Sequence, residues 1–207
     1  MKITYYGHAC FALTQGDFTA VVDPYDNLPG YDTLDLKANG VYCSHGHSDH
    51  AFTEAVTLCD GKNPFAVETV DSFHDSNLGR NRGNNTIHIF EADGLRVAHL
   101  GDLGHLLNQK QVDALGKVDV LMVPVGGYYT IDAIEAVKVC LQIKPTVVLP
   151  MHYSGKNFGF DEIAKADEFL TKIRPYYPVF ESKNNSFDTE NLTKQVVLLT
   201  YQGGCNQ

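Results

Sequence analysis

One short segment of the chain holds three histidines and an aspartate within six residues. They are His45, His47, Asp49 and His50. Imidazole nitrogen and carboxylate oxygen are ligands that zinc, iron and manganese share, and residues two apart in a turn can converge on one ion. The chain has nine histidines in 207 residues, so this density is far above chance. The segment therefore predicts a metal site rather than a polar loop.

Further ligands are expected where other apolar runs end. Three protein ligands and an open position are typical of a catalytic metal, and a second ion raises the number of ligands to about six or seven. His74 follows the run 65–73, Asp102 follows the run 97–101, and His152 follows the run 147–151. His88 and His99 are alternatives to His74, but both lie inside expected strands, where a histidine is more often packed and hydrogen-bonded. One edge of the domain could collect all the ligands.

The elements that must position these residues are readable from the apolar pattern. Alternating runs bounded by Gly, Asp and Pro predict strands at 2–6, 10–14, 18–22, 40–44, 64–73, 86–90 and 95–100. The second half alternates helices at 109–116, 131–143 and 161–173 with strands at 118–123, 146–149 and 195–201. Thr130 is the expected cap of the second of these helices, and 182–191 is an expected surface loop.

This pattern predicts an α/β (α+β) protein. The expected architecture is a four-layer αββα sandwich of two mixed β-sheets flanked by helices, formed by residues 1–207 as a single domain. With 43% apolar and 20% charged residues and no long apolar run, the chain is expected to be water-soluble and not membrane-spanning. Five widely spaced cysteines without a C-x-x-C pair argue against a disulfide framework or a thiolate zinc site.

The formal charge of −9 disfavours non-specific binding to nucleic acid or anionic lipid, because both require a dense positive surface. No charged and apolar leader precedes the first expected strand, so the cytoplasm is the expected location. The expected partner is a small-molecule substrate. A homo-oligomer is compatible with the sequence.

The order of motifs resembles that of the metallo-β-lactamase superfamily. H-x-H-x-D-H is followed by a later histidine, by G-D and by a last histidine after a helix and a strand. Four segments are similar to its branch related to L-ascorbate-6-phosphate lactonase: 3–11, 21–24, 99–105 and 150–153. The resemblance implies the metallo-β-lactamase fold and a metal-dependent hydrolase.

The resemblance also implies a ligand set for two ions. His45, His47 and His74 would hold the first ion, Asp49, His50 and His152 the second, and Asp102 would bridge them. Asp23 is similar to an aspartate that fixes the histidine loop by hydrogen bonds, although before Pro24 it could simply form a turn. His8 could face the substrate pocket or cap the first turn, and His105 is expected at the rim.

Two divalent ions would ionise a water molecule near neutral pH for attack on a lactone, ester, amide or phosphodiester. Asp49 and Asp102 are expected to orient that water, since no Ser or Cys stands in a nucleophile-elbow pattern. Zinc is the expected metal, with manganese and iron as alternatives.

Two other kinds of protein compete with the hydrolase. Flavin-linked di-iron redox proteins on this scaffold resemble H-x-E-x-D, but here His47 stands in the place of that glutamate and no flavodoxin-like domain follows. A non-catalytic metal-binding module is the third alternative.

Two arginines follow His74 closely, on what the sequence suggests is a flexible loop. The planar guanidinium of Arg80 or Arg82 could hold an anionic group of the substrate, because its fork matches carboxylate and phosphate. The alternative is two solvated arginines on the surface of an acidic protein.

Overall fold

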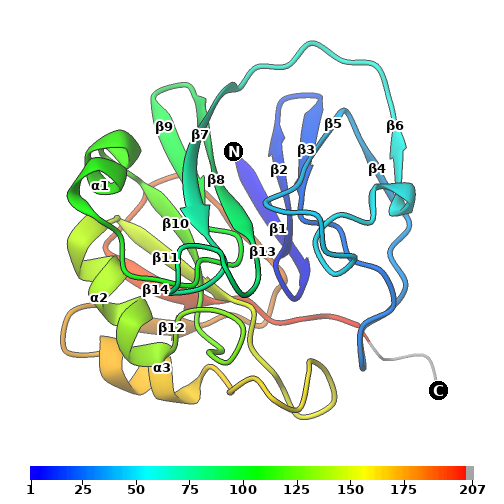
Figure 1. Cartoon of the computed structure of the whole chain (residues 1–207). Coiled ribbons are helices and arrows are strands. Elements are labelled where there is room, and N and C mark those ends of the chain that lie inside the picture. The colour runs from blue at the N-terminus through cyan, green and yellow to red at the C-terminus, as the bar shows by residue number, and fades with distance from the viewer. Residues whose placement is uncertain (204–207) are drawn as a thin grey trace.

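A five-stranded mixed sheet carries most of the N-terminal strands (Figure 1). The computed structural model describes residues 1–203. In spatial order the strands are β13 (Ser186–Asp188), β1 (Lys2–Gly7), β2 (Cys10–Gln15), β3 (Phe18–Val22) and β5 (Gly40–Tyr42). Only β3 and β5 pair in parallel.

A seven-stranded mixed sheet faces it. Its strands, in spatial order, are β12 (Val179–Glu181), β14 (Gln195–Leu198), β11 (Val147–Met151), β10 (Val120–Pro124), β9 (Leu95–His99), β8 (Asn84–Ala92) and β7 (Ala66–Phe73). Neighbouring strands pair in parallel through β12, β14, β11, β10 and β9, and the β7–β8–β9 meander adds antiparallel pairs. The predicted sandwich of two mixed sheets is therefore confirmed.

Side chains along the buried strands point alternately to opposite faces, so these strands contribute to two hydrophobic cores. In β10 the side chains of Val120 and Met122 pack between the two sheets, whereas Leu121 and Val123 pack beneath the helices. Successive strand residues point to opposite faces, and a strand covered on both faces is apolar throughout. The sheets are thus held at a fixed separation, which also fixes the distance between loops at their edges.

Three α-helices cover the outer face of the seven-stranded sheet: α1 (Gln109–Leu115), α2 (Ala133–Ile143) and α3 (Asp167–Ile173). On the opposite side of the molecule (Figure 1) lie β4 (Leu36–Ala38) and β6 (Val56–Leu58), which pair in parallel, and the 3₁₀ turn η1 (Thr53–Ala55). Within residues 1–203 no α-helix covers the five-stranded sheet, so this layer differs from the expected one.

Three local expectations are corrected by the structure. Asp132, and not Thr130, caps α2, because its carboxylate accepts from Glu135 N at 2.8 Å in a capping box. Helix α3 begins at Asp167 instead of 161. The expected loop 182–191 contains β13, since its backbone finds a partner in β1, far away in the sequence.

Among residues 1–203 no helix is both long enough and apolar enough to cross a bilayer. Cys10, Cys43, Cys59 and Cys140 are free thiols. Cys205 lies outside the described residues.

Candidate metal centre

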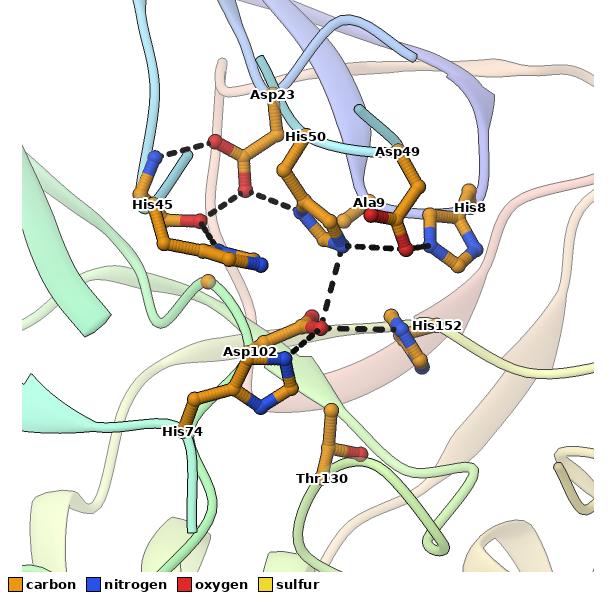
Figure 2. Close-up of polar contacts among 12 residues, drawn as sticks. His8, Ala9, Asp23, His45, Asp49, His50, His74, Asp102, Thr130 and His152 are labelled. Atoms are coloured by element: carbon orange, nitrogen blue, oxygen red, sulfur yellow. Dashed lines mark hydrogen bonds and ion pairs between the residues drawn. The ribbon is translucent and has the colours of Figure 1, made fainter. Parts of the chain in front are cut away.

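The candidate ligands gather at one edge of the sandwich, where strands from both sheets end. The histidine segment follows β5, His74 follows β7, Asp102 comes shortly after β9, and His152 follows β11. Figure 2 shows their side chains converging from both sheets on one space. The common edge expected from the sequence is therefore present in the fold.

The first group consists of His45, His47 and His74. One ring nitrogen of each lies within 4.8 Å of the others, a separation that a single ion can span. The ring centroids of His45 and His74 are 4.7 Å apart, and those of His47 and His74 are 5.3 Å apart. The structure thus places His74 beside the histidine segment.

The second group consists of Asp49, His50, His152 and His8, with one ligand atom of each again within 4.8 Å of the rest. The expected members are the first three. His8 joins them from the turn between β1 and β2, and its Nε2 lies 3.4 Å from Asp49 Oδ2. Of the two alternatives left open by the sequence, facing the pocket or capping the first turn, neither describes His8 fully, because it joins the ligand cluster and does not line the cavity.

Asp102 lies between the two groups. Its Oδ2 is 3.2 Å from Nε2 of His74, 3.2 Å from Nε2 of His50 and 3.4 Å from Nε2 of His152. The carboxylate is buried, and Figure 2 shows it at the centre of the cluster. A side chain in this position can be shared by two ions.

Asp23 organises the histidine segment from behind. Its carboxylate accepts hydrogen bonds from Ser44 N at 2.7 Å and Ser44 Oγ at 2.6 Å, and it contacts His50 Nδ1 at 2.8 Å. With Nδ1 of His50 held by the carboxylate, Nε2 is left to face the cluster. The structure therefore gives Asp23 a positioning contact in addition to its place in a turn.

The alternative histidines lie elsewhere. His99 Nε2 is 2.9 Å from Ala9 O, and its Nδ1 accepts from Gly101 N. His88 packs against Tyr42, with ring centroids 5.9 Å apart. His105 is half-buried, and its Nε2 accepts from Phe73 N at 3.2 Å. None of the three joins a ligand group among the described residues.

Asn85 and Gly101 position Asp102; Gly101 belongs to the G-D motif, whereas Asn85 has no signal in the sequence. Asn85 Oδ1 accepts from Asp102 N at 2.8 Å, while its Nδ2 donates to Leu100 O and Ser72 Oγ. Gly101 has φ +55°, and a Cβ there would lie 2.4 Å from Asn85 Oδ1. Only glycine lets the loop approach this closely.

Burial favours the metal-binding form of His45 and His8, and neighbouring histidines favour that of Asp102. Burial lowers the pKa of His45 to about 3 and that of His8 to about 4, so both rings are neutral with a free lone pair at neutral pH. Burial opposes ionisation of Asp102, but His152 and His50 outweigh it and hold its pKa well below the usual range. A neutral histidine and an ionised carboxylate are the forms that bind metal.

Several of these atoms are buried without a hydrogen bond. Within residues 1–203 they are both ring nitrogens of His8 and His152, Nε2 of His45 and His50, Nδ1 of His74 and Oδ1 of Asp102. Buried polar atoms are nearly always paired, and such a concentration of unpaired donors and acceptors is costly. Divalent ions are groups that would satisfy them together, so the residues present fit a metal centre.

Backbone strain also concentrates here. His8, Asp23 and His152 adopt φ values of +52°, +51° and +52°, a region that non-glycine residues seldom occupy. Such conformations cost about 1–3 kcal/mol each and persist where surrounding structure enforces them. The structure around the site therefore holds these three residues in conformations that are unfavourable on their own.

A cavity of about 440 Å³ opens onto the cluster. Its lining residues are Asn27, Leu28, His47, Ser48, Asp49, His74, Arg82, Asp102, Tyr129 and Phe160. The tyrosine and phenylalanine give it apolar walls away from the carboxylates. This volume suits a small molecule.

The two arginines have different surroundings in the structure. Arg82 lines the cavity, with its guanidinium carbon 5.4 Å from the Tyr129 ring centroid and 6.0 Å from that of Tyr128. Arg80 is exposed and does not line it. A cation over an aromatic ring keeps its orientation without losing its charge.

Asp75 holds the loop that carries Arg82. Its buried carboxylate accepts from the backbone N–H groups of Asn77, Gly79, Asn81 and Arg82 at 2.7 to 3.0 Å. One carboxylate thus closes the loop on itself and gives the expected flexible segment a defined set of hydrogen bonds.

Comparison with known proteins agrees with this geometry. A model of the β-lactamase superfamily domain matches residues 2–152. A UPF0173 metal-dependent hydrolase from Archaeoglobus fulgidus is 30% identical, aligned over 74% of this chain and 84% of the relative. A Thermotoga maritima crystal structure, described as a candidate zinc-dependent hydrolase of the metallo-β-lactamase superfamily, is 34% identical, with a TM-score of 0.73 and coverage of 96% and 97%.

Igni18, a metallo hydrolase from Ignicoccus hospitalis, shares the fold at 22% identity, with a TM-score of 0.61 over 84% of this chain and 90% of that one. The chain belongs to the metallo-β-lactamase superfamily. Within it, the chain is similar to the proteins named UPF0173 metal-dependent hydrolases.

Proposed function

We propose that this protein is a metal-dependent hydrolase with a binuclear centre. The observation that carries the proposal is the pair of ligand groups at the floor of one cavity, with the Asp102 carboxylate between them. The names of the A. fulgidus relative and of the T. maritima structure support hydrolysis. His47 belongs to the first ligand group and stands where the di-iron redox proteins have a glutamate. Its imidazole therefore favours a hydrolase over those proteins.

In this proposal His45, His47 and His74 hold the first ion. Asp49, His50 and His152 hold the second, and Asp102 is shared. Zinc is the expected metal, and manganese or iron suits the same nitrogen and oxygen donors. When bound, a pair of such ions lowers the pKa of water to near neutrality and stabilises negative charge on oxygen.

The chain's own residues supply position and orientation. The carboxylates of Asp49 and Asp102 accept hydrogen bonds from the attacking water and so aim its lone pair at the substrate. Asp23 fixes the ring of His50, and Asn85 fixes the backbone of Asp102. Such prior orientation is a large part of what an active site contributes to rate. The reaction is the addition of water across a lactone, ester, amide or phosphodiester bond.

Reconstitution tests this function. Protein stripped by a chelator is expected to be inactive against lactones, esters, amides and phosphodiesters, and zinc or manganese should restore hydrolysis of at least one class. Activity should continue to rise between the first and second equivalents of metal, because both ions contribute. Failure to hydrolyse any member of the panel with either metal would contradict the proposal. Lactones belong in the panel because of the resemblance to the lactonase branch.

We further propose that Arg82 binds an anionic group of the substrate. It lies on a loop fixed by Asp75, at the wall of the cavity and over Tyr129, so its charge is already oriented toward the site. Its guanidinium fork matches a carboxylate or phosphate. Arg80, on the same loop but exposed, offers a matched control.

Arg82→Ala is expected to raise KM for a carboxylated or phosphorylated substrate about 10- to 150-fold, because hydrogen bonds to charged groups contribute about 1.5–3 kcal/mol. The KM for a neutral ester of the same shape should change little. Steady-state kinetics on this substrate pair measure the effect, and Arg80→Ala should resemble wild type. Equal KM values for Arg82→Ala and wild type on the anionic substrate would show that Arg82 is only a solvated wall residue.

A further inference from the structure

His8 is a buried histidine whose ring has no hydrogen-bond partner. It lies in the turn between β1 and β2, is 0% exposed, and makes no hydrogen bond through Nδ1 or Nε2 within residues 1–203. His99 is equally buried, but both of its ring nitrogens are hydrogen-bonded. Since buried polar atoms are normally paired, the ring nitrogens of His8 are expected to bind a group other than a hydrogen-bonding residue of the chain.

The ring of His8 points into the second ligand group. Its centroid is 4.2 Å from that of His152 and 5.0 Å from that of His50. Its Nε2 is 3.4 Å from Asp49 Oδ2. Figure 2 shows His8 on the same side of Asp102 as Asp49 and His152. The four ligand atoms of this group lie within 4.8 Å of one another, which one ion can span.

The backbone fixes this orientation. His8 has φ +52°, an unfavourable value, and its carbonyl accepts from His152 N at 2.8 Å and from Tyr5 Oη at 3.3 Å. His8 and His152 are therefore tied together directly, although 144 positions separate them in the sequence. A strained conformation held by such bonds is typical of a functional position.

We propose that His8 is a direct ligand of the second metal ion, together with Asp49, His50, His152 and the shared Asp102. The proposal rests on the binuclear centre proposed above. It gives the second ion one more protein donor than the first. A residue that only oriented Asp49 would also make the 3.4 Å contact between His8 Nε2 and Asp49 Oδ2, but it would leave Nδ1 and the contact with His152 unexplained.

Zinc titration of the metal-free protein against a chromophoric chelator tests the proposal. His8→Ala removes the donor. His8→Gln keeps a group that can hydrogen-bond to Asp49, but its carboxamide is a poor zinc ligand. His88→Gln is the control, because His88 is buried outside the ligand groups. Circular dichroism of the metal-free proteins verifies that each variant folds.

Both His8 variants are expected to lose more than about 100-fold in affinity at one zinc site, beyond the 10–100-fold typical of residues that only orient a ligand. The other site and the His88 variant should match wild type. In the wild-type protein, long-range ¹H–¹⁵N NMR spectra should show His8 Nε2 bound to zinc, an observation that needs no variant.

Unchanged affinities in both His8 variants, rescue by glutamine, or a protonated Nε2 in the loaded wild type would overturn the assignment. Wild-type protein that binds a single zinc would instead reject the binuclear centre, and this assignment with it.

Discussion

Asp102→Ala is expected to lower kcat/KM by more than about 100-fold, beyond the range typical of residues that only orient a metal ligand. The carboxylate contacts histidines of both groups at 3.2 to 3.4 Å, so without it the two proposed ions would lose a shared ligand and the negative charge between them. Steady-state kinetics and metal content should be measured on the same samples, because loss of metal is an expected part of the defect.

His105→Ala is the comparison for that variant. This histidine follows the G-D motif closely in sequence but does not line the cavity, and its ring nitrogens contact the N–H of Phe73 and the carbonyl of Leu106. Each of these neutral hydrogen bonds contributes about 1 kcal/mol to the stability of the fold and neither holds a proposed ligand, so activity should fall less than about tenfold. Equal losses in the two variants, with metal retained in both, would show that Asp102 is not shared by the ions.

Metal removal is expected to have the largest effect on the molecule as a whole. The protein should bind about two ions per chain, since eight side chains form the proposed ligand set when His8 is included. Each ion present at about 1,000 times its dissociation constant stabilises the fold by about 4 kcal/mol, so stripping it should lower Tm by roughly 8–16 °C. The physical reason is that the stripped site leaves Asp102 and several ring nitrogens buried without partners.

Elemental analysis and thermal unfolding check this expectation. Stripped protein should recover both its metal content and its Tm when zinc or manganese is restored. No more than one ion per chain after incubation with an excess of zinc and with an excess of manganese would refute a binuclear centre.

Local sequence determined much of the fold. Period-two alternation in the N-terminal half and apolar runs such as 118–123 identify strands, because a side chain's exposure follows from its place in the pleat. The ends of those strands also point to all seven ligands proposed for the two ions, with His88 and His99 left as alternatives to His74, since polar residues directly after buried strands can meet at a sheet edge. The His45–His50 segment needed no structure to be recognised.

Pairings between distant segments were decided by the tertiary structure alone. The strand β13 lies in a stretch rich in Asn and Ser, and it is a strand because β1 offers it backbone partners. Likewise, α3 starts late because residues before Asp167 bond elsewhere, as in the bridge between Ser154 and Lys165. Neither interaction has a local signature.

The details of the candidate site divide in the same way. The sequence by itself determined that histidines and aspartates would gather at one edge, because that depends on strand ends alone. Only the tertiary structure decided that His74 joins His45 and His47, that His8 lies against His152, and that Arg82 lines the cavity while Arg80 does not. These choices depend on loops closed by single contacts, such as the carboxylate of Asp75, and residue type or spacing does not specify such contacts.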